Sequence, residues 1–156
     1  MRKLIRYWLP VVIWTAVILQ ASGRTFDAPH TTSLFQHIFE VIGLQFSEGT
    51  LFVIDHMARK AAHLTEYGIL TALSFRAARA DRRGFALRWA AIAFAITVCV
   101  ASTDETLQSF TPTRTGTPWD VLLDSCGATI ALLLIALFHR QRSQLSGSGA
   151  NHSLSS

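Results

Sequence analysis

Ten polar and ionisable residues flank or enter three apolar stretches of this 156-residue chain, at spacings that suit binding or acid–base chemistry. They are Arg59, Lys60, His63 and Glu66 in the first group, Asp104, Glu105, Gln108 and Arg114 in the second, and Asp120 and Asp124 in the third. Residues three or four apart share one face of a helix. The spacing within each group therefore turns several side chains the same way, and we predict that the ten form one ligand-binding site.

His63, Glu66 and Asp120 are the candidates for catalysis. His63 carries the group whose charge changes nearest neutral pH, and Glu66, three residues on, is placed to orient its ring. The sequence has no nucleophile elbow, no glycine loop that cradles phosphate and no phosphatase motif. We therefore treat the three residues as candidates for proton transfer and assign no reaction and no catalytic residue.

Carboxylate oxygens together with one imidazole suit a divalent cation. However, the chain contains no HExxH motif, no cysteine cluster and no EF-hand pattern. Salt bridges from Arg59 and Arg114 to the acids account for the same residues without an ion. We therefore predict neither a metal nor a cofactor.

The polar residues lie against segments that suit a membrane. Half of the residues are hydrophobic and 15% are charged, whereas about a quarter are charged in soluble domains. A helix needs about 20 mainly apolar residues to cross the bilayer. Four stretches approach that length, and they cover about residues 7–22, 61–78, 87–103 and 119–138. The fold class expected is all-α: a polytopic membrane protein with a four-helix transmembrane bundle that forms one domain over residues 1–140.

The lysine and arginine residues predict the orientation of the bundle. Ten of the fourteen lie at the two termini or within residues 76–88, which connect the second and third stretches and include the adjoining end of each; only Arg24, Arg59, Lys60 and Arg114 lie elsewhere. Cytoplasmic loops of membrane proteins carry an excess of these residues. Both termini are therefore expected in the cytoplasm, and the ten site residues at the outer membrane face. We attribute the positive net charge to topology and expect no nucleic-acid partner.

Three segments outside the site have their own predictions. The first stretch has a basic start and small residues at 21–23, which also suit a signal peptide, but we favour a retained span. The apolar spacing of TSLFQHIFEVIGLQF, within the external segment at about 23–58, predicts an extra amphipathic helix on the membrane surface or over the bundle. Residues 141–156, rich in serine and glycine, are expected to be a disordered cytoplasmic tail.

Three blocks of the sequence resemble a known family. RKAAHLTEYGIL, DETLQSFTPTR and DVLLDSCGA are similar, in order and spacing, to the signature blocks of the VanZ-like family of small bacterial integral membrane proteins. Many relatives carry Asn at the position of Asp124. The family is named for a protein associated with teicoplanin resistance, so the resemblance implies a protein of the bacterial cytoplasmic membrane with a role in the cell envelope.

Two functions are consistent with these patterns. In the first, the site binds or acts on an amphiphile at the outer leaflet, such as a lipid-linked cell-wall precursor or a lipoglycopeptide, with a possible role of the glycopeptide-resistance type. In the second, the protein is a non-catalytic membrane scaffold or a small proton-linked carrier, and the cluster is a structural latch. In both, the lipid bilayer is a partner.

Overall fold

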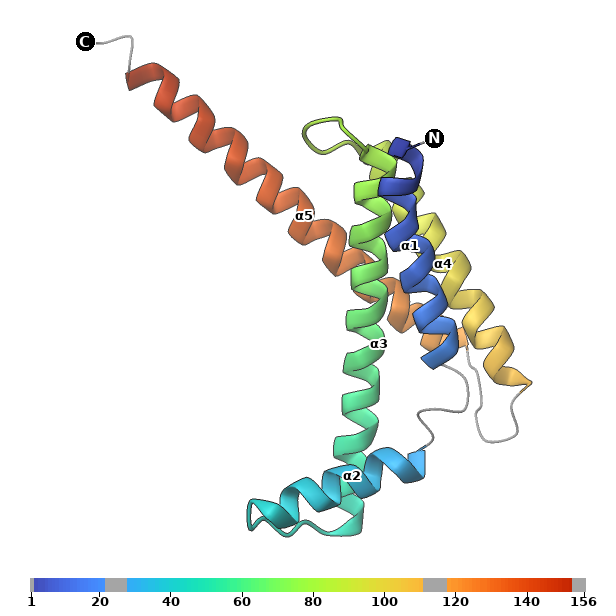
Figure 1. Cartoon of the computed structure of the whole chain (residues 1–156). Helices are drawn as coiled ribbons and strands as arrows, with labels where there is room; N and C mark the ends of the chain where they lie inside the picture. The colour runs from blue at the N-terminus through green and yellow to red at the C-terminus, as the bar shows by residue number, and fades with distance from the viewer. Residues whose placement is uncertain (1, 22–27, 111–117, 153–156) are drawn as a thin grey trace.

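The computed structural model describes residues 2–21, 28–110 and 118–152, and this part of the chain contains helices and no strand. The helices are α1 (Arg2–Ala21), α2 (Ala28–Val41), α3 (Glu48–Arg79), α4 (Leu87–Ser109) and α5 (Pro118–His152). Figure 1 shows α1, α3 and α4 side by side, with α5 crossing α3 and then leaving the other helices. The predicted all-α class is confirmed.

Within the described residues, three helices are long and apolar enough to cross a membrane, which indicates a membrane protein. The qualifying segments are Arg2–Gln20, Leu87–Ser109 and Pro118–Gln144. They overlap the predicted first span as far as Gln20 and contain the predicted third and fourth spans. The predicted second span, residues 61–78, lies in α3, which is long enough but does not meet the same measure of hydropathy. The four-span arrangement therefore stays a prediction.

The helix that carries the first polar group begins earlier than its predicted span. Ser47 caps the N-terminus of α3, because its side-chain oxygen accepts a hydrogen bond from the Thr50 backbone N–H at 3.3 Å. From there the helix runs 32 residues to Arg79. Such a helix is about 48 Å long at 1.5 Å per residue. The last part of the predicted external segment, from residue 48 to about 58, thus forms the first three turns of α3.

Apolar side chains both large and small, together with a few polar ones, fill the space between α1, α3 and α4. The buried core includes Ala77 on α3 and Ala93 and Ala101 on α4, with Ile18 from α1. Thr71 on α3 and Thr97 on α4 share a buried hydrogen bond of 2.8 Å. In a bilayer, close packing and hydrogen bonds between helices replace the hydrophobic effect as the main source of association.

The closest approach between helices joins α3 to α5 at Gly127. A Cβ atom at Gly127 would lie 2.5 Å from the backbone oxygen of Leu64. Where α3 passes α5, Gly68 faces the backbone of Gly127 and the side chain of Ala131. The sequence predicts close approach at Gly127 and Ala131, because small residues four apart let another helix come near. The structure confirms it.

A polar contact joins the start of α1 to the turn after α3. Lys3 Nζ lies 2.9 Å from an oxygen of Asp81, and the Tyr7 hydroxyl donates a hydrogen bond to the other oxygen. The Tyr7 hydrogen bond, and then Lys3, lower the pKa of Asp81 below its usual range. Figure 1 places the N-terminus, the end of α3 and the start of α4 at the same end of the molecule.

Two predictions outside the bundle have different outcomes. A helix is present at α2, where the amphipathic helix is predicted, while its contact with a membrane stays a prediction. The disordered tail predicted for residues 141–156 is wrong from Gln141 to His152, because α5 continues through these residues. Extending an existing helix costs less than nucleating one, and Gln141, Arg142 and Gln144 favour helix.

We predict that Gly127→Ala destabilises the folded protein by about 1–3 kcal/mol, since the added methyl group meets the α3 backbone rather than a flexible side chain. Thermal unfolding of the purified protein in detergent would measure the change. Gly49→Ala is the matched control, because a Cβ atom there has nothing within 4 Å. Equal melting temperatures for Gly127→Ala and the unchanged protein would contradict the α3–α5 geometry.

Candidate functional site

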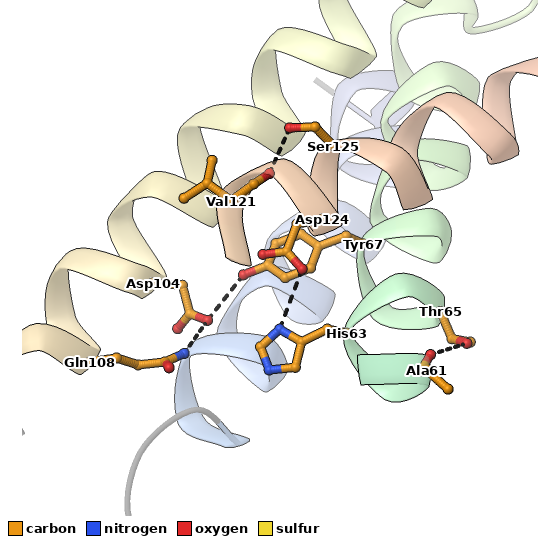
Figure 2. Close-up of polar contacts among 9 residues, drawn as sticks. All are labelled: Ala61, His63, Thr65, Tyr67, Asp104, Gln108, Val121, Asp124 and Ser125. Atoms are coloured by element: carbon orange, nitrogen blue, oxygen red, sulfur yellow. Dashed lines mark hydrogen bonds and ion pairs between the residues drawn. The ribbon is translucent and has the colours of Figure 1, made fainter. Parts of the chain in front are cut away.

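Six polar residues gather where α3, α4 and α5 meet, and we call them the polar cluster. They are His63 and Tyr67 on α3, Asp104, Glu105 and Gln108 on α4, and Asp124 on α5. Figure 2 shows five of them, His63, Tyr67, Asp104, Gln108 and Asp124, pointing toward one another from the three helices. The three sequence blocks thus meet at one place in the fold, although the first two are about 40 residues apart in the sequence.

Among the described residues, two hydrogen-bond donors hold the carboxylate of Asp104. The Tyr67 hydroxyl donates to Oδ2 at 3.1 Å from across the helix interface, and Gln108 Nε2 donates to the same oxygen at 2.8 Å from one turn along α4. The latter contact exists because α4 continues to Ser109, six residues beyond the predicted span. Tyr67 and Asp104 are 0% exposed. At this side of the cluster the Asp104 carboxylate is therefore shielded from solvent, and its orientation is fixed by hydrogen bonds.

His63 and Asp124 form the contact between α3 and α5. His63 Nδ1 lies 3.4 Å from Asp124 Oδ1. The Asp124 side chain is 0% exposed, whereas the His63 side chain is 24% exposed. The Tyr67 ring stacks beside the His63 ring, with 6.2 Å between centroids. The cluster is thus buried at Asp124 and reachable at His63.

Glu105 completes a group of three potential metal ligands. It is 6% exposed, and one of its carboxylate oxygens, one His63 ring nitrogen and one Asp124 oxygen all lie within 4.8 Å of one another. An imidazole and two carboxylates from three different helices are therefore the residues of this site that could hold a metal ion.

Other predicted site residues lie around the polar cluster. Glu66 is half-buried on α3, and Trp14 of α1 donates a hydrogen bond to its backbone oxygen at 3.0 Å. Asp120 is half-buried in the first turn of α5, one turn before Asp124. Lys60 is half-buried on α3. Arg114 lies outside the described residues.

Arg59 has a different partner from the one expected. Its guanidinium lies 3.0 Å from a carboxylate oxygen of Asp55, one turn earlier in α3. Asp55 is 1% exposed and was not among the predicted site residues. The spacing of four between Asp55, Arg59 and His63 could have identified it, because these residues share one helix face.

Tyr67 is the other member of the site absent from the predicted ligand-binding set. It belongs to the first signature block, but its hydroxyl could be placed against Asp104 only with the interhelical geometry. An amphipathic residue such as tyrosine is often no more than a packed aromatic ring, so its type alone carries little information.

The chain matches a known family model over most of its length. A model described as VanZ/LLP1 matches residues 7–139, which include all ten predicted site residues. Comparison with curated proteins and with solved structures gives no match.

We predict that Tyr67→Phe lowers stability by about 1–2 kcal/mol, because it removes a hydrogen-bond donor to a buried carboxylate. Tyr7→Phe is the control, since the same change there removes a hydrogen bond to exposed Asp81 and should have a smaller effect. The measurement is the melting temperature of each variant in the same detergent. An effect of Tyr67→Phe no larger than that of Tyr7→Phe would show that Tyr67 does not hold Asp104.

Proposed function

The chain belongs to the VanZ/LLP1 family, and from this premise we propose that its polar cluster binds or acts on the head group of an amphiphilic molecule of the bacterial envelope. A lipid-linked cell-wall precursor and a lipoglycopeptide such as teicoplanin are the two ligand types considered. The protein would then contribute to tolerance of such antibiotics or to another envelope trait. The alternative is a non-catalytic membrane scaffold or a small proton-linked carrier, in which the polar cluster is a structural latch.

Burial of ionisable groups among membrane helices is the observation that supports this proposal. Asp104 and Asp124 are both 0% exposed, and they belong to two helices apolar enough to span a bilayer. Ionisable groups at such positions are expensive and are usually tied to function. The partial exposure of His63, Glu66 and Asp120 leaves one side of the cluster open to a ligand.

The proposed topology has four spans and both termini in the cytoplasm of the inner membrane. In this arrangement α3 is the fourth membrane-crossing helix, although its polar residues lower its hydropathy. Its packing against α1, α4 and α5 supports this placement, because the polar residues then face protein rather than lipid. The basic turn at 79–83 lies at one end of α3, whereas His63 lies more than three turns away.

We predict that Ser109→Cys reacts with a membrane-impermeant maleimide in intact cells, while Arg82→Cys reacts only after the cells are permeabilised. Both are made in a chain in which Cys99 and Cys126 are replaced by serine. Ser109 ends α4 and Arg82 follows α3, and both are exposed. The reverse pattern of labelling would overturn the topology and would place the polar cluster at the cytoplasmic side.

We predict that Glu66→Gln and Asp120→Asn abolish the phenotype of the protein without reducing its amount in the membrane. Both changes keep the shape of the side chain and its ability to form hydrogen bonds; they remove the negative charge and turn one acceptor oxygen into a donor NH₂ group. The assay complements a deletion strain and measures teicoplanin tolerance first, then sensitivity to other envelope stresses. Membrane abundance is measured by immunoblotting in the same cells.

Glu40→Gln is the matched control, since Glu40 is exposed on α2 and is not part of the site. It should complement the deletion fully. If Glu66→Gln and Asp120→Asn also complement fully, the charges are not needed for function, and the latch interpretation replaces the binding site.

A further inference from the structure

We infer that His63, Glu105 and Asp124 form a binding site for a divalent transition-metal cation of the Zn²⁺ or Mn²⁺ type. This inference goes beyond the proposed function, because metal binding can be tested with no amphiphile present. The site uses one ligand from each of α3, α4 and α5. The three helices that build the polar cluster would thereby share one ion.

The spacing of the donor atoms fits coordination better than direct pairing. His63 Nδ1 and Asp124 Oδ1 are 3.4 Å apart, longer than the usual N–H···O distance of about 2.9–3.0 Å. Two ligands at about 2.1 Å from a tetrahedral metal stand about 3.4 Å from each other. The Glu105 oxygen lies within 4.8 Å of both atoms. An ion can therefore contact all three after small side-chain adjustments.

Asp124 provides an independent reason to place a cation here. Its side chain is 0% exposed, and neither of its oxygens accepts a hydrogen bond from the described residues. The facing Nδ1 of His63 also makes no hydrogen bond within that part of the chain. A buried carboxylate that accepts no hydrogen bond, and whose one ion-pair contact in that part of the chain is His63 at 3.4 Å, is costly. A cation between the two side chains would supply the missing interaction to both.

The residues around His63 and Asp124 already have other partners. Arg59, the cation expected beside the acids, pairs with Asp55. Asp104 accepts hydrogen bonds from Tyr67 and Gln108, so we do not count it among the metal ligands. These contacts fix the side chains around the site, and among the described residues the only ion pair of Asp124 is the one with His63.

The donor set indicates the class of metal. One imidazole nitrogen and two carboxylates suit Zn²⁺, Mn²⁺ or Fe²⁺, whereas a copper(I) site would use thiolate or thioether ligands. Cys99 and Cys126 are free and exposed. Three protein ligands also leave at least one coordination position open, as in catalytic zinc sites.

The open coordination position could bind the head group of the ligand. This step of the inference rests on the proposed function. Five acidic residues surround the site, counting Glu66 and Asp120, and by themselves they repel an anionic head group. A bound cation reverses the local charge and offers a direct ligand position to a phosphate or carboxylate oxygen. The metal would thus explain how an acidic cluster accepts an anionic amphiphile.

The test uses the full chain purified in detergent, stripped with EDTA and dialysed against Zn²⁺ or Mn²⁺. We expect about one ion per chain at saturation, the number that a single three-ligand site accepts. We expect His63→Ala, Glu105→Gln and Asp124→Asn each to weaken binding by at least about tenfold. Absorption of a Co²⁺-substituted sample should show nitrogen and oxygen ligands, and its spectrum should be lost in His63→Ala.

His56→Ala, Glu48→Gln and Asp81→Asn are controls of the same residue types outside the site, and they should bind as the unchanged chain does. Circular dichroism and gel filtration identify any variant that fails to fold. The metal site is overturned if the unchanged chain binds neither Zn²⁺ nor Mn²⁺ at the highest concentrations tested. It is also overturned if folded His63→Ala and folded His56→Ala bind the metal with equal affinity. If the unchanged chain binds no metal but Glu66→Gln still loses the envelope phenotype, the proposed function stands and only the metal site is rejected.

Discussion

The close contact between α3 and α5 at Gly127 determines the geometry of the rest of the site. Leu64 lies against Gly127, His63 precedes Leu64, and Asp124 lies one turn before Gly127. A side chain at position 127 would push the helices apart, because a Cβ atom would come 2.5 Å from a backbone oxygen. The 3.4 Å contact between His63 and Asp124 therefore depends on the absence of a single methyl group. It is the kind of dependence that packing of small residues creates between membrane helices.

From this contact outward, each helix adds a constraint to the same buried space. Tyr67 fixes the carboxylate of Asp104 on α4, Gln108 supports it from the same helix, and Trp14 attaches α1 to α3 beside Glu66. Polar groups that would be costly in lipid are thus distributed over interfaces between helices. The arrangement keeps one side accessible through His63, which is the property that a binding site requires and a fully closed latch does not.

Much of this could be predicted from the sequence, because apolar stretches and helical spacing are local signals. The helix class, the face shared by Asp104 and Gln108 and the close approach at Gly127 all follow from periodicity and residue size. The start of α3 at Glu48, the pairing of Arg59 with Asp55 and the role of Tyr67 do not, since they depend on helix continuity and on which side chains meet across an interface. Within the described residues, three helices rather than four are apolar enough to span a membrane, because the polar residues of α3 weaken the signal that identifies a span.

The central claim is that the polar cluster holds the head group of an amphiphile. Native mass spectrometry of the protein released from gentle detergent, followed by identification of co-purifying lipids, tests it most directly. We predict that the unchanged chain retains an amphiphile with an anionic or glycosylated head group. We also predict that a variant carrying both Glu66→Gln and Asp120→Asn, purified in the same way, does not retain it. The same set of lipids in the same amounts on both proteins would contradict the claim.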